Sequence, residues 1–280
     1  MMRIKFINKK ITSISFIFLF TLIPFLKVFP IKTFFISTFL LAQSNTKIYS
    51  EEFNEDKYVL YRKRFYESVQ KGDYSGAIKA LNQLIKIENH NFLKSGLYVN
   101  RGVYKGKLGD IKGEENDYRK AIALNEKEYH AYLNLGVLKI STGNISDALS
   151  FFEKGIKVEP KKFLGYYRIA QTKYLHLEEK DLPGAIYYYK KAIEVDPKHP
   201  LVAKTYRDLG TIMAMDKENF TASIFYFSKA ISIDPKFSSA YHNRGSSKRF
   251  IGDLKGACSD YKLALSLGYN KSLKEIKKFC

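Results

Sequence analysis

The sequence predicts an all-α fold in which antiparallel helix pairs stack one on the next behind an apolar N-terminal leader. Three observations predict it. An aromatic residue followed four positions later by a small residue recurs with a period near 34 residues. A Gly-Asp or Gly-Asn turn signal splits most copies into two helix-like halves, and Pro closes several of them.

The first 42 residues indicate a segment that is targeted to or across a membrane. They contain six basic residues and no acid, and residues 11–26 carry no charge. A basic start before an apolar run is typical of a signal peptide, and Ala42 could end a cleavage site, although Leu40 fits its small-residue position poorly. An uncleaved anchor is the alternative, with Pro24, Lys27 and Pro30 interrupting a longer span. Either reading places the rest of the chain on the extracytoplasmic side, after a polar linker at residues 43–57.

The repeat is visible at two landmarks in each copy. A small residue followed four positions later by an aromatic, as in Ala148 and Phe152, forms the second landmark. The first landmark reads YVNRG, YLNLG, YYRIA, YRDLG and YHNRG, starting at Tyr98, Tyr132, Tyr166, Tyr206 and Tyr241 with spacings of 34, 34, 40 and 35. A weaker copy starts at Tyr61.

This period and order resemble the tetratricopeptide repeat. The resemblance covers residues 58–271, and it implies a right-handed superhelical solenoid. The first two units are degenerate, with Phe65 in place of the small residue and Glu114 in place of Ala. The expected units are 58–91, 95–128, 129–162, 163–199, 203–237 and 238–271, followed by a C-terminal cap at 272–280.

Packing explains why a costly glycine recurs inside a helix. Gly136 would let the two helices of its unit approach, with Phe152 filling the space beside it. Glycines before the second helix, such as Gly143, would end the first helix, and the following Asp or Asn would cap the second. In the cap, Leu273, Ile276 and Phe279 are expected to face the last repeat.

Two arginines that look like ligand-binding residues are predicted to be structural. Arg101 and Arg244 are each followed 16 residues later by an acid, Asp117 and Asp260, so a bidentate ion pair within each unit is expected. Arg64 stands at the same position, but Ala80 replaces the acid. Arg64 is therefore the better candidate for a free basic contact.

The resemblance implies a binding face on the first helices, which line the concave wall in tetratricopeptide proteins. Asparagines there can bind a peptide backbone, since an amide both donates and accepts, although Asn is also simply common at this position. The residue set of the chaperone-tail carboxylate clamp is absent. The expected peptide-binding groove comprises Asn100, Val103, Leu133, Asn134, Val137, Tyr167, Arg168, Arg207 and Asn243.

We therefore expect a non-catalytic scaffold, adaptor or assembly factor that binds a peptide or helix of a partner protein. The histidines lack metal-ligand spacing and GVYKGKL lacks the P-loop pattern, so no enzyme, cofactor, metal or small-molecule substrate is predicted. The net charge of +19 leaves one alternative, an electrostatic binder of nucleic acid or of an anionic membrane surface. Nucleic acid is disfavoured because the basic residues are dispersed among acids.

The two cysteines leave two readings open. Cys258 follows Ala257 in an expected helix, which suggests a buried packing thiol. In an exported protein it could instead form a disulfide with Cys280.

Overall fold

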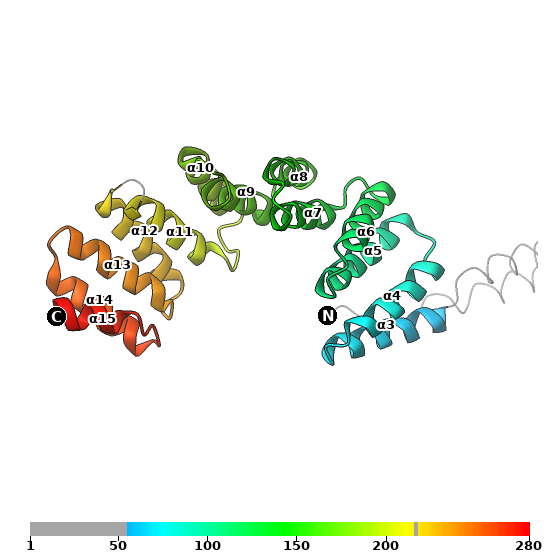
Figure 1. Cartoon of the computed structure of the whole chain (residues 1–280), viewed down its shortest axis with the longest axis horizontal. Coiled ribbons are helices and arrows are strands. Elements are labelled where there is room, and N and C mark those ends of the chain that lie inside the picture. Colours follow the sequence, from blue (N-terminus) through cyan, green and yellow to red (C-terminus); the bar gives the residue numbers. More distant parts are fainter. Residues whose placement is uncertain (1–54, 216–217) are drawn as a thin grey trace, which may run out of the picture. The chain divides into compact units, whose positions relative to one another are not determined.

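The computed structural model describes residues 55–215 and 218–280, and within them it is entirely helical (Figure 1). The predicted leader at 1–42, and the linker up to residue 54, lie outside the described residues. No helix in the described part has both the length and the apolar character needed to cross a membrane.

Thirteen helices in this part form six pairs and a final single helix. The partners of each pair pack against each other in antiparallel fashion, and each pair packs on the next, which confirms the predicted solenoid of helix pairs. The pairs are α3 (Glu55–Gln70) with α4 (Tyr74–Ile87), α5 (Asn91–Lys107) with α6 (Ile111–Leu124), α7 (Tyr129–Ser141) with α8 (Ile145–Val158), α9 (Phe163–Leu175) with α10 (Leu182–Val195), α11 (Val202–Met215) with α12 (Phe220–Ile233), and α13 (Ser238–Phe250) with α14 (Leu254–Ser266). The last helix is α15 (Ser272–Phe279).

The recurring glycines are packing positions, as predicted. A Cβ added at Gly102 would lie 2.7 Å from the Tyr118 ring, and one added at Gly210 would lie 2.7 Å from the Phe227 ring. Gly136 meets Phe152 in the same way. The aromatic of the second helix therefore packs directly on the backbone of the first.

The two degenerate units compensate for their substitutions. In the first, Phe65 replaces the glycine of the first helix, and the fully buried Leu81 replaces the aromatic of the second. The aromatic ring of this unit is therefore supplied by the first helix instead of the second. In the second, the Glu114 carboxylate lies against Gly106, where any Cβ would collide with it. The Tyr118 hydroxyl donates a hydrogen bond to that carboxylate at 3.0 Å.

The turns within pairs follow the predicted chemistry with one exception. Gly109 has a φ of 82°, which glycine adopts without strain, and Asp110 accepts a hydrogen bond from the Gly113 backbone N–H at 2.9 Å. Asn144 was expected to cap α8 but makes no capping hydrogen bond; its amide donates to the Thr142 hydroxyl at 3.2 Å instead.

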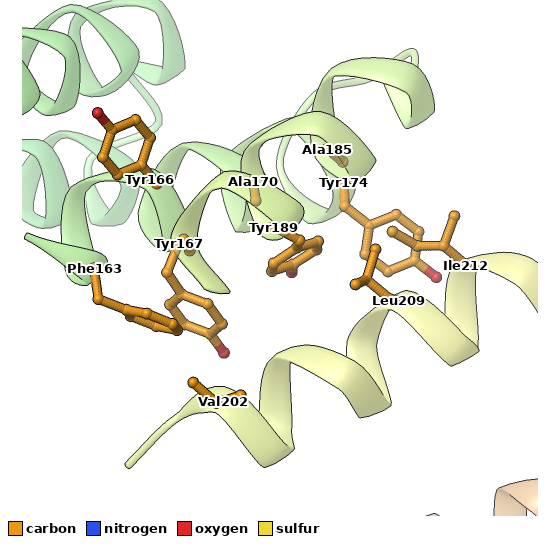
Figure 2. Packing of buried hydrophobic residues seen from close by; sticks show 11 residues of the cluster. Phe163, Tyr166, Tyr167, Ala170, Tyr174, Ala185, Tyr189, Val202, Leu209 and Ile212 are labelled. Atoms are coloured by element: carbon orange, nitrogen blue, oxygen red, sulfur yellow. The ribbon is translucent and has the colours of Figure 1, made fainter. Parts of the chain in front are cut away.

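The largest aromatic cluster lies around the fourth pair (Figure 2). Phe163 and Tyr167 of α9 are stacked with ring centroids 5.6 Å apart, and Tyr189 of α10 packs beside Tyr167 at 5.7 Å. Leu209 of α11 closes the cluster from the following pair. Side chains of the fourth and fifth pairs thus pack in one shared cluster.

The C-terminal helix decides between the two readings of the cysteines and differs from prediction at one residue. Cys258 forms a disulfide with Cys280 at the end of α15, which is the second of the two readings. Leu273 is 44% exposed rather than facing the last repeat, because α15 is joined to the preceding helices through Ser272 and the following Cys280 instead. Ser272 is buried, and its hydroxyl lies 2.9 Å from Nδ1 of His242 on α13.

Candidate functional site

The expected groove residues all lie on the first helices of their pairs, as the repeat register requires. Asn100 on α5 is exposed, and Asn134 on α7 and Asn243 on α13 are half-buried. Val137 on α7 is 40% exposed, whereas Val103 on α5 is half-buried against the core. We call the surface formed by the exposed and half-buried members of this set the A-helix face.

Two of the expected residues contribute almost no surface to this face. Leu133 packs in the core with Tyr129 and Phe152, and Tyr167 packs with Phe163 and Tyr189. The Tyr167 hydroxyl reaches the following pair, where it donates to the Asp208 carboxylate at 3.2 Å. Both residues fill the junction between pairs, which the pattern within a single unit does not reveal.

The middle of the A-helix face carries charge that is largely engaged within the chain. Arg207 contacts the Asp208 carboxylate at 3.0 Å, and Arg168 donates to the Gln171 side-chain oxygen at 3.2 Å. Burial raises the pKa of the Asp208 carboxyl, while Arg207 and the Tyr167 hydrogen bond oppose that rise. This part of the face therefore carries two arginines that already contact neighbouring side chains, beside a largely desolvated acid.

Two amides of the face, Asn134 and Asn243, have different neighbours. Near Asn134, burial raises the pKa of the Tyr118 hydroxyl, the adjacent Glu114 raises it further, and a hydrogen bond with Asn134 opposes the rise. Burial also raises the pKa of the Glu114 carboxyl. Asn134 is thus linked to the buried Tyr118 and, through it, to the half-buried Glu114.

Asn243 instead borders a cavity of about 200 Å³ between α11, α12 and α13. The Phe220 and Phe250 rings, which are stacked 4.6 Å apart, form one wall. Met215, which is 73% exposed, lies at another. The lining is completed by Thr211, Ala214, Phe227, Ser246 and Ser247. An apolar cavity beside an amide suits an apolar side chain of a bound peptide.

The sequence prediction did not include this cavity, although a signal was present. The residue five positions after the small residue of each first helix is Lys107, Ser141, Leu175, Met215 and Phe250 in units two to six. In the last two units these residues, Met215 and Phe250, are both large, apolar and exposed, and both line the same cavity.

The arginines of the second and sixth units belong to the fold, as predicted. Arg101 donates through Nε and Nη2 to both oxygens of Asp117, at 2.7 and 2.6 Å, and Lys105 adds a contact at 2.9 Å. The hydrogen bonds to Asp117 raise the pKa of Arg101.

The sixth unit repeats this arrangement. Arg244 donates to Asp260 at 2.8 and 2.7 Å, and Lys248 contacts the same carboxylate at 2.9 Å. Each arginine also reaches the preceding pair, through Asn82 or Ser228. These groups stabilise the stack and are not available to a ligand.

The described residues contain no group of three or more His, Cys, Asp or Glu side chains placed to hold a metal ion.

Known proteins share this architecture. A family model described as "Tetratricopeptide repeat" matches residues 95–128, 129–162 and 203–237. A search of the curated proteins gave no match.

Solved structures give the same result. The structure of MamA is 23% identical and aligns over 64% of this chain and 93% of its own, with a TM-score of 0.53. YrrB, described as a TPR protein with an unusual peptide-binding site, is 18% identical over 72% of this chain and 100% of its own, with a TM-score of 0.53. PilF of Pseudomonas aeruginosa is 16% identical over 64% and 79%, with a TM-score of 0.57. The solved structures share the fold, and the three family-model matches together with the helix pairs show that the chain is built of tetratricopeptide repeats.

Proposed function

We propose that the chain is a non-catalytic interaction module that binds a segment of a partner protein on its A-helix face. The observation that carries this proposal is the cavity beside Asn243, where an amide and an apolar pocket adjoin on the predicted face. An extended peptide would place an apolar side chain in the cavity, against the wall formed by Phe220 and Phe250, while Asn243 holds its backbone. YrrB, which shares this fold and is described as having an unusual peptide-binding site, supports the binding of a peptide.

The test places a photo-crosslinking residue at Met215 in living cells. Lys154, which is exposed on α8, serves as the control position. We expect one discrete adduct from Met215 and none from Lys154, and mass spectrometry of the adduct would identify the bound segment. Adducts from Lys154 alone would contradict the assignment of the A-helix face.

A synthetic peptide of that segment then allows a quantitative test. Asn243→Ala should weaken its binding about tenfold, because loss of a buried hydrogen bond leaves the peptide backbone unpaired. Lys154→Ala should leave the affinity unchanged. If binding falls steeply with salt and is unaffected by Asn243→Ala, the electrostatic alternative would be favoured.

We also propose that the repeats act on the extracytoplasmic side of a membrane. The basic and apolar character of residues 1–42 supports this location, and so does the Cys258–Cys280 disulfide, since disulfides persist in oxidising compartments. The test is thiol alkylation of the protein in its native cells. We expect no alkylation before reduction and two modified thiols after it, whereas alkylation without reduction would contradict the proposal.

A further inference from the structure

The first helix pair contains a cavity of about 560 Å³ between α3 and α4. Most of the residues that line it carry polar or charged groups, and three of them are basic: Arg64, Lys71 and Lys79. Tyr61, Ser68 and Ala80 lie among the other residues that surround it. This cavity involves neither Asn243 nor any other residue of the A-helix face.

The register of the repeats explains why the cavity exists. In the second unit, Arg101, Lys105 and Asp117 form a closed cluster, and Arg244, Lys248 and Asp260 do the same in the sixth. The equivalent positions of the first unit are Arg64, Ser68 and Ala80. The arginine is retained, while the lysine and the aspartate are replaced by small residues. The space that the missing side chains would fill is open and borders Arg64.

Arg64 has no acidic partner within the described part of the chain. It is exposed, and its guanidinium lies 5.8 Å from the centre of the Tyr61 ring. The two acids of the cavity are engaged elsewhere: Asp73 accepts from the Gly76 N–H at 2.8 Å, and Glu67 pairs with Lys63 at 3.9 Å.

We propose that this cavity binds a carboxylate side chain of an acidic protein segment, in the place that Asp117 and Asp260 take in their own units. A guanidinium binds a carboxylate through two parallel hydrogen bonds. Lys71 and Lys79 add positive charge around the same space. The carboxylate could come from another protein or from this chain, whose sequence carries Glu51 and Glu52 shortly before α3.

The test measures binding of a fluorescein-labelled peptide of alternating Asp and Gly to the full-length chain in mild detergent and 0.15 M salt. Because the chain carries a net charge of +19, some non-specific attraction is expected. Arg62→Ala controls for this non-specific attraction. It removes the same charge from the same helix, but Arg62 does not line the cavity. Two variants address the cavity: Arg64→Ala removes the donor, and Ala80→Asp supplies the carboxylate from within the chain.

We expect Arg64→Ala and Ala80→Asp each to weaken binding at least tenfold, and Arg62→Ala to change it less than twofold. A second outcome also supports the site. If the wild-type chain does not bind the peptide, but a variant with both Glu51 and Glu52 changed to Gln does and this binding requires Arg64, the carboxylate in the cavity comes from the chain itself. Equal losses in Arg64→Ala and Arg62→Ala would overturn the proposal. So would retained binding in Ala80→Asp, or no binding in either the wild type or the Glu51/Glu52 variant.

Discussion

The first and the fourth helix pairs are built on the same repeat but differ in how completely they are packed. Along α9, eight residues are buried, and an aromatic cluster joins its pair to the next (Figure 2). Along α3, no residue is buried, and its pair contains the larger of the two cavities described above. The comparison teaches that the same register yields a core where its positions carry interacting side chains, and an open site where small residues such as Ser68 and Ala80 replace them.

The largest expected difference comes from removing an aromatic ring in each region. Changing Phe152, which is fully buried on α8, to Ala should lower the free energy of unfolding by about 3–5 kcal/mol. Changing Phe65, which is only half-buried on α3, to Ala should lower it by less than about 2 kcal/mol, because fewer contacts are lost. Urea unfolding followed by circular dichroism measures both. Equal losses would contradict the contrast between the two regions.

Substitutions in the closed ion-pair clusters should give the next largest loss of unfolding free energy. Asp117→Ala would leave Arg101 and Lys105 partly buried without their acid, at a cost of about 3 kcal/mol. Combining it with Arg101→Ala should recover part of the loss, since the unpaired guanidinium is then absent. A double-mutant cycle of thermal unfolding measures this coupling. Additive losses would show that the pair does not act as a unit.

Two glycines allow a matched test of the packing role. Gly136→Ala should destabilise the fold by about 1–3 kcal/mol, because the new Cβ would collide with the Phe152 ring. Gly96→Ala on α5 meets nothing within 4 Å and should instead stabilise it by roughly 0.5–1 kcal/mol through higher helix propensity. The two melting temperatures should therefore move in opposite directions. A shift of the same sign in both variants would argue against backbone–ring packing at Gly136.

The smallest predicted effect is a pH dependence at α15. Burial lowers the pKa of His242 from 6.5, with Lys271 lowering it further and Glu275 opposing. The folded state therefore resists protonation of His242, and stability that is present above pH 6.5 should be lost as the pH falls through the lowered pKa.

Hydrogen exchange of residues 272–279 at pH 7.5 and 5.5 measures this loss. His242→Gln, which does not titrate, should reduce the difference between the two pH values. An unchanged difference in that variant would assign the effect to other groups.

Much of the fold could be predicted because the repeat places interacting residues at fixed separations. Gly136 with Phe152, and Arg101 with Asp117, lie 16 residues apart in one unit, and both contacts were expected from that spacing. Contacts between units were harder to predict. Leu133 and Tyr167 lie in the core because a neighbouring pair covers them, which the pattern of one unit does not record.

The candidate sites depend on the same contacts between units. Asn243 was expected from its register, but the cavity beside it requires Phe220 and Phe250 from two different pairs. The Cys258–Cys280 disulfide likewise depends on how α15 packs on α14. In contrast, the absence of an acid for Arg64 was visible in the sequence as Ala80.

The central claim is that the first pair lacks a carboxylate that its register would otherwise supply. The most direct measurement compares the melting temperatures of Ala80→Asp and Ala80→Asn at pH 7, since these side chains have nearly the same shape and differ in charge. The account predicts that Ala80→Asp melts at the higher temperature, because only its carboxylate pairs with Arg64. A lower melting temperature for Ala80→Asp than for Ala80→Asn would contradict it.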